Sequence, residues 1–401
     1  MNVPVMGLEH VYWGLPIVIY PYISGLVAGS FIVGSLSKVF GQKIFEPIAK
    51  LSLLVTLAFL LVAPLAPLSD ARQPSRLLEL YTRAHLPYSP LGLFTMIWTT
   101  YVLLVLVEVY FAFRQDNIRL GQVVPGWRGA LYRFFALGSH DLSERAQRRD
   151  HALLVFLASA GILLAFAFHG YIGFVFGAIK ARPLWSNPLM PVLFIVSAIV
   201  SGVALMILVY SVVWRYLSPE RRTDPRIIEG LVSLLMWTIF IDLFLDAVDL
   251  LNSGVSAYAS GPVFQGFSQI FMGGPLTFMY WGLQLGFLVL ALVLTFFRFV
   301  RRSALWASLA ALLTVISVYA MRYNTVIGGQ LQPKVSQGLI LYTPPAFGRA
   351  SVQVVIGLFA IVLFIFSLLV EFLPWEPLDS LLSSGAPTRG VESGASTPVK
   401  G

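Results

Sequence analysis

Long apolar runs recur along this 401-residue chain, and polar residues gather in the short segments between them. Apolar runs of about 18 residues or more are typical of transmembrane α-helices. The runs lack the alternating polarity that the strands of a membrane β-barrel would require. The pattern predicts an all-α polytopic integral membrane protein with about nine spans, at residues 14–36, 47–67, 90–113, 152–178, 189–214, 227–250, 275–297, 303–322 and 350–373.

Three segments outside these runs have a distinct character. Residues 69–89 are polar and contain one amphipathic piece, made of Leu77, Leu78, Leu80 and Tyr81. Residues 251–274 carry no charge and read either as an interfacial helix or as a short tenth span, although Pro262 and paired glycines argue against spanning. The tail from 378 is rich in Ser, Gly and Pro, which predicts disorder.

Composition and charge support the membrane assignment. Charged residues make up 11% of the chain, against roughly 25% in soluble domains, and the mean hydropathy is +0.80. The net charge of +8 does not indicate nucleic-acid binding, because the basic residues lie in loops between spans. With the N-terminus outside, 19 of the 27 Lys and Arg residues fall on the inside. The positive-inside rule then predicts N-out, C-in in the cytoplasmic (inner) membrane.

The inventory of metal-ligating residues is short. The chain has no cysteine, so we expect it to hold no Fe–S cluster and no thiolate metal site. Of five histidines, only His169 lies clearly within a span, whereas haem b commonly needs two on facing helices. We therefore expect neither haem nor metal, and a haem-b membrane anchor remains an alternative.

Ionisable residues inside the spans are the main candidates for function. Each costs at least about 2.5 kcal/mol in the bilayer centre and needs a physical reason. Asp242, Asp246 and Asp249 follow i, i+4, i+7 spacing, so they share one face of the sixth span. The predicted topology places them and His169 in the outer half of the membrane, and Glu108 toward the inner side. This distribution predicts a polar pocket in the outer leaflet, with Glu108 as a link to the other face.

Further polar residues flank the spans on the same outer side. A quinone head group needs hydrogen-bond partners for two carbonyls and a proton donor or acceptor, which a His and a carboxylate near aromatic walls can supply. Proton uptake across the bilayer needs a chain of ionisable groups. The candidates are His169, His10, Glu9 and His85 for quinone binding; Asp242, Asp246, Asp249 and Glu108 for proton relay; and Arg322 and Asn324 for structure or partner contact at the outer face.

An internal echo suggests duplication. The first span contains Ser24-Gly25-Leu26-Val27-Ala28-Gly29, and the fifth contains Ser197-Ala198-Ile199-Val200-Ser201-Gly202. Small residues at this spacing also allow close helix packing in lipid. We predict two four-helix bundles and a peripheral helix: 1–180 with the quinone site, 181–325, 326–377 for an outer loop and the last span, and 378–401 for the tail.

Several stretches together resemble the NrfD/polysulfide-reductase membrane subunit family, most closely its branch with uptake-hydrogenase membrane subunits and the Dsr sulfur-metabolism complex. They are Trp13-Gly14 with Tyr22 to Phe31, the segment starting His169-Gly170-Tyr171, Arg182-Pro183-Leu184-Trp185 with Pro188 and Pro191, and Arg322-Tyr323-Asn324 to Gln330.

The resemblance implies a subunit of a respiratory oxidoreductase complex that is not catalytic alone. It would bind menaquinone or ubiquinone and exchange electrons with a ferredoxin-like Fe–S subunit, which serves a catalytic redox subunit. Proton translocation is a further expectation. The family's quinone site lies in the first bundle, whereas the three aspartates fall in the second, which favours a separate half-channel.

A secondary transporter is the other alternative. Internal repeats and acids near the midplane suit that class, but no pair of clearly broken helices occupies matching positions.

Overall fold

The computed structural model describes residues 9–86, 88–216, 223–254, 261–334 and 338–376. Within these residues, nine helical segments are long and apolar enough to cross a membrane, which confirms the predicted all-α class and spans. They are α1 (Leu15–Val39), α2 with α3 (Glu46–Val62 and Leu65–Asp70), α5 (Pro90–Val123), α7 (Glu144–Gly177), α8 (Met190–Tyr216), α9 (Pro225–Gly254), η3 with α11 (Phe278–Gly286 and Phe287–Phe296), α13 with η4 and α14 (Ala304–Tyr323, Asn324–Gly328 and Gly329–Leu331) and α15 (Val352–Phe372).

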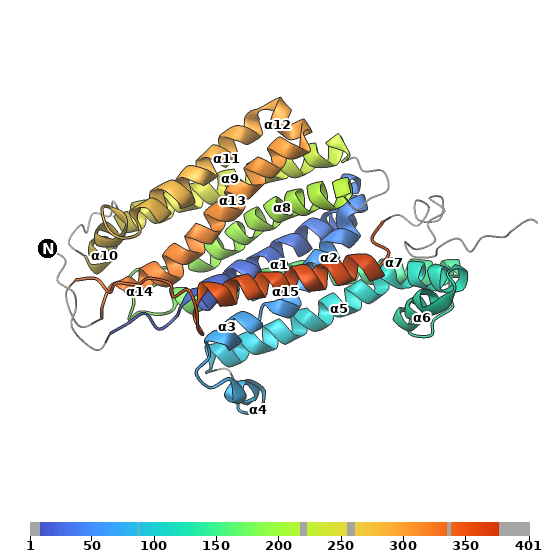
Figure 1. Cartoon of the computed structure of the whole chain (residues 1–401), viewed down its shortest axis with the longest axis horizontal. Coiled ribbons are helices and arrows are strands. Elements are labelled where there is room, and N and C mark those ends of the chain that lie inside the picture. Colours follow the sequence, from blue (N-terminus) through green and yellow to red (C-terminus); the bar gives the residue numbers. More distant parts are fainter. Residues whose placement is uncertain (1–8, 87, 217–222, 255–260, 335–337, 377–401) are drawn as a thin grey trace, which may run out of the picture.

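The long helices pack in two neighbouring rings. Helices α1, α2, α5 and α7 contact one another in a cycle, and α8, α9, α11 and α13 form a second cycle. The rings meet where α8 packs on α1 and α7, and where α13 also touches α1. Helix α15 lies outside both and packs mainly on α2 (Figure 1). This is the packing that a duplicated four-helix unit with one peripheral helix would produce.

The shorter elements lie near the ends of the long helices (Figure 1). They are η1 (Lys43–Phe45), η2 (Pro74–Leu78), α4 (Glu79–Thr82), α6 (Gly126–Phe135), α10 (Pro262–Phe271) and α12 (Arg298–Arg302). Helix α10 has 10 residues and is about 15 Å long, which is half of a ~30 Å hydrocarbon core. Of the two interpretations of 251–274, α10 therefore fits the non-spanning one. The tail from 378 lies outside the described residues.

Helix starts follow local sequence. Ser89, Ser143 and Ser351 each accept a hydrogen bond from a backbone N–H in the first turn of α5, α7 and α15. Such caps satisfy amide groups that the helix itself cannot pair. Proline in the first turn of α1 and α5 is also favourable, because those positions need no amide hydrogen.

The two echo segments face each other across the contact between the rings. A Cβ built on Gly29 would lie 2.1 Å from the carbonyl oxygen of Ala198, and one built on Gly202 would lie 2.3 Å from the backbone of Gly29. Both distances are far inside van der Waals contact. Helices α1 and α8 therefore approach backbone to backbone, which only glycine permits here.

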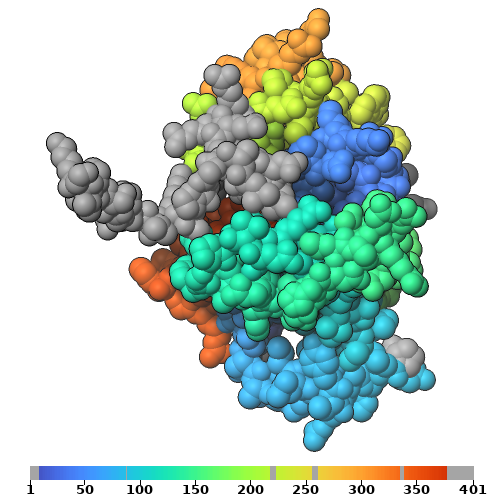
Figure 2. Space-filling model, turned by 90° about the vertical axis from the view of Figure 1, so that its right-hand side faces the viewer, coloured from blue at the N-terminus to red at the C-terminus, as the bar shows by residue number. Residues whose placement is uncertain are grey.

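At the other end of the molecule from α10 and α14, residues 114–149 carry seven arginines and include α6. Seen from that end, this segment forms a broad band across the molecule in teal to green (Figure 2). Arg114 anchors it: the buried guanidinium contacts Asp150 Oδ2 at 2.5 Å and Ser139 Oγ at 2.6 Å. Because one buried charge compensates the other, the pair fixes the loop between α5 and α7.

We predict that Gly202→Ala lowers the free energy of unfolding by about 1–3 kcal/mol, the usual cost of overpacking a tight contact. Gly357→Ala in α15 is the matched control, because a Cβ there meets nothing within 4 Å. Chemical unfolding in mild detergent measures both. Equal stability of the two variants would show that the α1–α8 contact is not tight.

Candidate functional site

A buried guanidinium lies at the contact between the two rings. The Arg322 side chain, on α13, is fully buried. Its Nη2 lies 3.0 Å from His169 Nε2 on α7 and donates to Ser197 Oγ on α8 at 2.7 Å. The same guanidinium stands 4.0 Å above the Phe194 ring, a cation–π contact. Arg322 thus joins three helices from both rings.

These contacts assign the hydrogens of His169. Arginine has donors only, so His169 Nε2 must accept the hydrogen bond from Arg322. The other ring nitrogen, Nδ1, lies 3.3 Å from Ser24 Oγ on α1 and is left as the protonated position. In this arrangement His169 is a neutral imidazole with both nitrogens engaged. Protonation of Nε2 would require Arg322 to withdraw.

The three aspartates of α9 lie on the other side of Arg322. Asp242 and Asp246 are buried and within electrostatic range of the guanidinium. Asp249 accepts a hydrogen bond from Asn187 Nδ2 at 2.5 Å. The predicted common face is therefore present, and it points into the second ring. Two carboxyl groups thus lie near one fixed positive charge, and the third is held by Asn187.

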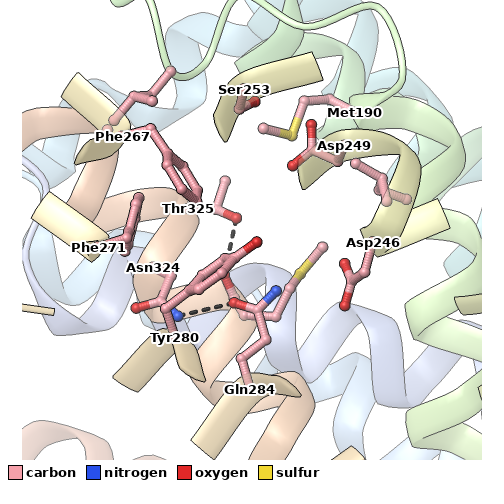
Figure 3. Close-up of a pocket in the computed structure, with 14 residues that line it drawn as sticks. Met190, Asp246, Asp249, Ser253, Phe267, Phe271, Tyr280, Gln284, Asn324 and Thr325 are labelled. Atoms are coloured by element: carbon pink, nitrogen blue, oxygen red, sulfur yellow. Dashed lines mark hydrogen bonds between the residues drawn. The ribbon is translucent and has the colours of Figure 1, made fainter. Parts of the chain in front are cut away.

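Asp246 and Asp249 line an internal cavity of about 60 Å³ (Figure 3). Its wall also includes Tyr280, Gln284 and Asn324. Gln284 ties η3 to η4 across this wall, because its Oε1 accepts from Asn324 Nδ2 at 2.9 Å. The space is enough for several waters or one small ion and too small for a quinone head group.

Two π-helical segments, η3 and η4, form one side of this cavity. They contribute Tyr280 and Gln284 from η3 and Asn324 and Thr325 from η4. π-Helical turns are rare and occur frequently at functional sites. Side chains engage their backbone: Ser317 Oγ donates to Gln284 O at 2.5 Å, and Trp185 Nε1 donates to Thr325 O at 2.6 Å.

The N-terminal segment closes this end of the molecule. Gln330 Oε1 accepts from the amides of Tyr12 and Trp13, both at 3.0 Å. Trp13 stacks on Trp185 with centroids 5.2 Å apart. Arg182 donates to Gln332 O at 2.6 Å; burial lowers the pKa of its guanidinium, and the nearby Glu9 carboxylate opposes that shift. The loop before α8, the N-terminal segment and η4–α14 therefore form one cap.

A separate polar line runs along α5 in the first ring. Phe94, Trp98, Tyr101 and Glu108 follow helical spacing along one side of α5. Trp98 Nε1, the Tyr101 hydroxyl and Glu108 Oε2 are all buried without a hydrogen-bond partner in the described part of the chain. Lys38 Nζ lies 3.7 Å from the other Glu108 oxygen. Unpaired buried polar atoms are costly, so this line is the site in the first ring that most needs an explanation.

The predicted quinone-binding residues fall in three places. His169 is inside the inter-ring contact. Glu9 accepts a hydrogen bond from the backbone amide of Lys334, and the exposed His10 ring lies 4.1 Å from the Tyr12 ring in a tilted arrangement, so both belong to the cap. His85 lies in a shallow groove with Arg76 and Arg83. Within the described residues, no contact joins His169 to Glu9, His10 or His85.

The comparisons with known proteins agree with this architecture. The sequence model of the polysulphide reductase NrfD family matches residues 5–334. This chain belongs to the NrfD family. A selenate reductase subunit of Mesobacillus selenatarsenatis is 30% identical over 379 residues, covering 90% of this chain and 85% of that protein. The Hdr-like menaquinol oxidoreductase integral membrane subunit of Archaeoglobus fulgidus is 24% identical over 381 residues, with coverage of 90% and 85%.

Like these NrfD-family relatives, the chain is a multi-pass membrane protein of the kind that serves multi-subunit reductase complexes, so catalytic partner subunits are implied. Several residues of this NrfD protein escaped the sequence analysis. Gln284 is a single amide in an apolar span, and that isolation was a usable signal. Trp98 and Tyr101 carry no such signal, because aromatic residues are ordinary in spans.

We predict that Arg322→Gln lowers the free energy of unfolding by at least about 1.5 kcal/mol, since it removes charge-assisted hydrogen bonds from two helices. Arg302→Gln is the matched control, because Arg302 forms an exposed pair with Glu229 at 3.7 Å, worth less than about 1 kcal/mol. Chemical unfolding in detergent compares them. Equal losses would remove Arg322 as the central tie between the rings.

Proposed function

We propose that this NrfD-family chain is the quinone-reactive membrane subunit of a respiratory oxidoreductase complex, and that it exchanges electrons between the quinone pool and an Fe–S partner. One observation carries the proposal: two unpaired buried hydrogen-bond donors, Trp98 Nε1 and the Tyr101 hydroxyl, stand beside a cluster of aromatic rings. The relative named a menaquinol oxidoreductase subunit supports the same chemistry.

The donors and the rings suit a quinone head group. Quinone carbonyls only accept hydrogen bonds, and Trp98 can only donate. The Phe94 ring lies 5.9 Å from Tyr20, 5.6 Å from Phe168 and 6.2 Å from Tyr171, centroid to centroid. Aromatic walls with a few placed polar groups are the usual form of such sites. The site would lie between α1, α5 and α7, in the first ring.

Proton supply would follow α5. Glu108 lies seven residues beyond Tyr101, about 10 Å along the helix, and pairs with Lys38. We assign this pair to the route between the head group and the inner face. Asp242, Asp246 and Asp249 would form a second proton relay in the other ring, as a half-channel separate from the quinone site.

The partner would supply the metal chemistry. The sequence contains no cysteine, so cluster ligation by thiolates has to come from another chain. We propose that a ferredoxin-like Fe–S subunit docks on the cap formed by residues 9–14, 182–187 and 329–334, which lies on the outer side under N-out, C-in topology. A catalytic redox subunit would complete the complex.

His169 would act on the reaction from the inter-ring contact. With Nε2 held by Arg322 and Nδ1 beside Ser24, it can exchange a proton only when one contact opens. Its ring stacks on Phe194, 5.6 Å away, and Phe194 in turn lies 5.8 Å from Phe176 under the cap. His10, Glu9 and His85 remain proposed contributors at the outer approach.

We predict that Tyr101→Phe raises the KM for quinol at least about tenfold in the assembled complex, the effect of one lost hydrogen bond of ~1.4 kcal/mol. Tyr110→Phe, on the same helix, is the control. Steady-state quinol oxidation with an artificial electron acceptor gives the KM of each variant. An unchanged KM in Tyr101→Phe would place the head group elsewhere.

We predict that His169→Ala lowers quinone-linked kcat by about 100-fold, the lower end of proton-transfer effects, while subunit assembly persists. His140→Ala, in the exposed loop before α7, serves as the control. Turnover is normalised to complex content from co-purification. Full turnover in an assembled His169→Ala complex would contradict the role of this histidine.

A further inference from the structure

The cavity of the second ring has an excess of negative groups. Asp246 and Asp249 line it, Asp242 precedes Asp246 by one turn on α9, and Arg322 is the fixed positive charge within electrostatic range of Asp242 and Asp246 among the described residues. Buried charge without compensation is strongly unfavourable, so the cluster must bind protons or a cation. The cavity itself holds two of these carboxylates, Asp246 and Asp249 (Figure 3).

A second, independent feature points to a ligand in this space. Tyr280 is 7% exposed, and its hydroxyl points into the cavity between the two aspartates (Figure 3). Among the described residues, no hydrogen bond engages this hydroxyl. A buried hydroxyl aimed at empty polar space needs a partner there.

The other lining groups supply neutral oxygen. Thr325 Oγ1 donates its hydrogen to Met321 O at 2.9 Å, which leaves its lone pairs free. Ser253 lines the same space, one turn after Asp249 on α9. Carboxylate and hydroxyl oxygens are the ligands of hard cations. Among the described lining residues there is no His, and the sulfur comes from the thioethers of Met190 and Met321, so the wall does not match a site for zinc.

Charge and size select the ion. No three His, Asp or Glu side chains gather as a metal cluster anywhere in the described part of the chain. Asp246 and Asp249 carry two negative charges and Arg322 near Asp246 carries one positive charge, so one further positive charge balances the group, which a monovalent cation supplies. A volume of about 60 Å³ suits a small ion that keeps one or two waters.

We infer that this cavity binds a sodium ion, held by Asp246 and Asp249 with the hydroxyls of Tyr280, Ser253 and Thr325. The site lies in the other ring and does not depend on the proposed quinone site; it uses two carboxyl groups of the proposed second relay, which could pass protons there only when the ion has left. The bound ion would compensate the excess carboxylate charge around Arg322. It would therefore stabilise the contact between α9, η3 and η4.

The test measures ion binding without turnover. The complex is purified in mild detergent, and its Tm is recorded while sodium chloride replaces choline chloride at constant ionic strength. We expect a saturable rise in Tm with Na⁺ that K⁺ does not reproduce. Binding of radiolabelled sodium to the same preparation gives the affinity directly.

Three variants make the result specific. Asp249→Asn is expected to raise the sodium concentration that gives half of the full Tm rise by about tenfold or more, equivalent to about 1.4 kcal/mol of binding free energy. Tyr280→Phe removes a single hydroxyl and shifts the midpoint in the same direction, which keeps the test usable if Asp249→Asn fails to fold. Glu371→Gln is the control, since this exposed carboxyl pairs with Arg128 at the opposite end.

Three outcomes would overturn the site. One is a Tm that changes with pH but not with Na⁺, which would mean that the cluster binds protons alone. Another is an equal response to K⁺ and Na⁺. The third is a Tm that depends on sodium in Asp249→Asn and Tyr280→Phe just as it does in the control Glu371→Gln.

Discussion

The buried charge of Arg322 is the constraint on which this architecture depends. A guanidinium inside a membrane protein must find acceptors, and Arg322 finds them on α7 and α8 while the carboxyl groups of α9 lie nearby. These requirements bring both rings to one point. The backbone contact of Gly29 and Gly202 brings α1 and α8 close together, and near it Ser24 contacts His169 while Ser197 accepts from the Arg322 that holds this histidine. Packing and electrostatics therefore specify one arrangement.

The molecule separates its polar chemistry into two regions with different surroundings. In the first ring, the line along α5 is narrow, aromatic and unpaired, which suits an uncharged acceptor with carbonyl oxygens. In the second ring, the cavity is small and rich in carboxyl groups, which suits protons or a small cation. His169 and Arg322 stand between the two. Asp242 and Asp246 act electrostatically on Arg322, which holds His169 Nε2, so the charge of the second ring bears directly on this contact.

Much of this was accessible from the sequence because each inference depended on a local pattern. Apolar run length predicted the spans, and the spacing of the three aspartates predicted their shared face. The echo of Ser24–Gly29 in Ser197–Gly202 identified segments of close packing, although it did not show that they contact each other. The ordered stretches at Trp13, His169, Arg182 and Arg322 indicated the NrfD family, which the comparisons show. The roles of His169, His10, Glu9, His85 and Glu108 remain predictions.

Taken alone, the sequence determined the membrane class, the number of spans, the lack of thiolate ligands and the family, because length, composition and motif order are properties of the chain itself. Only the tertiary structure decided which polar groups meet. The Arg322–His169 contact joins residues 153 positions apart, and the cavity combines α9, η3 and η4. The π-helical turns that carry Gln284 and Asn324 accept hydrogen bonds from Ser317 and Trp185, which are distant in the sequence, and helical periodicity does not encode them. Contacts between distant helices depend on how backbones approach in space, which no local pattern of residues specifies.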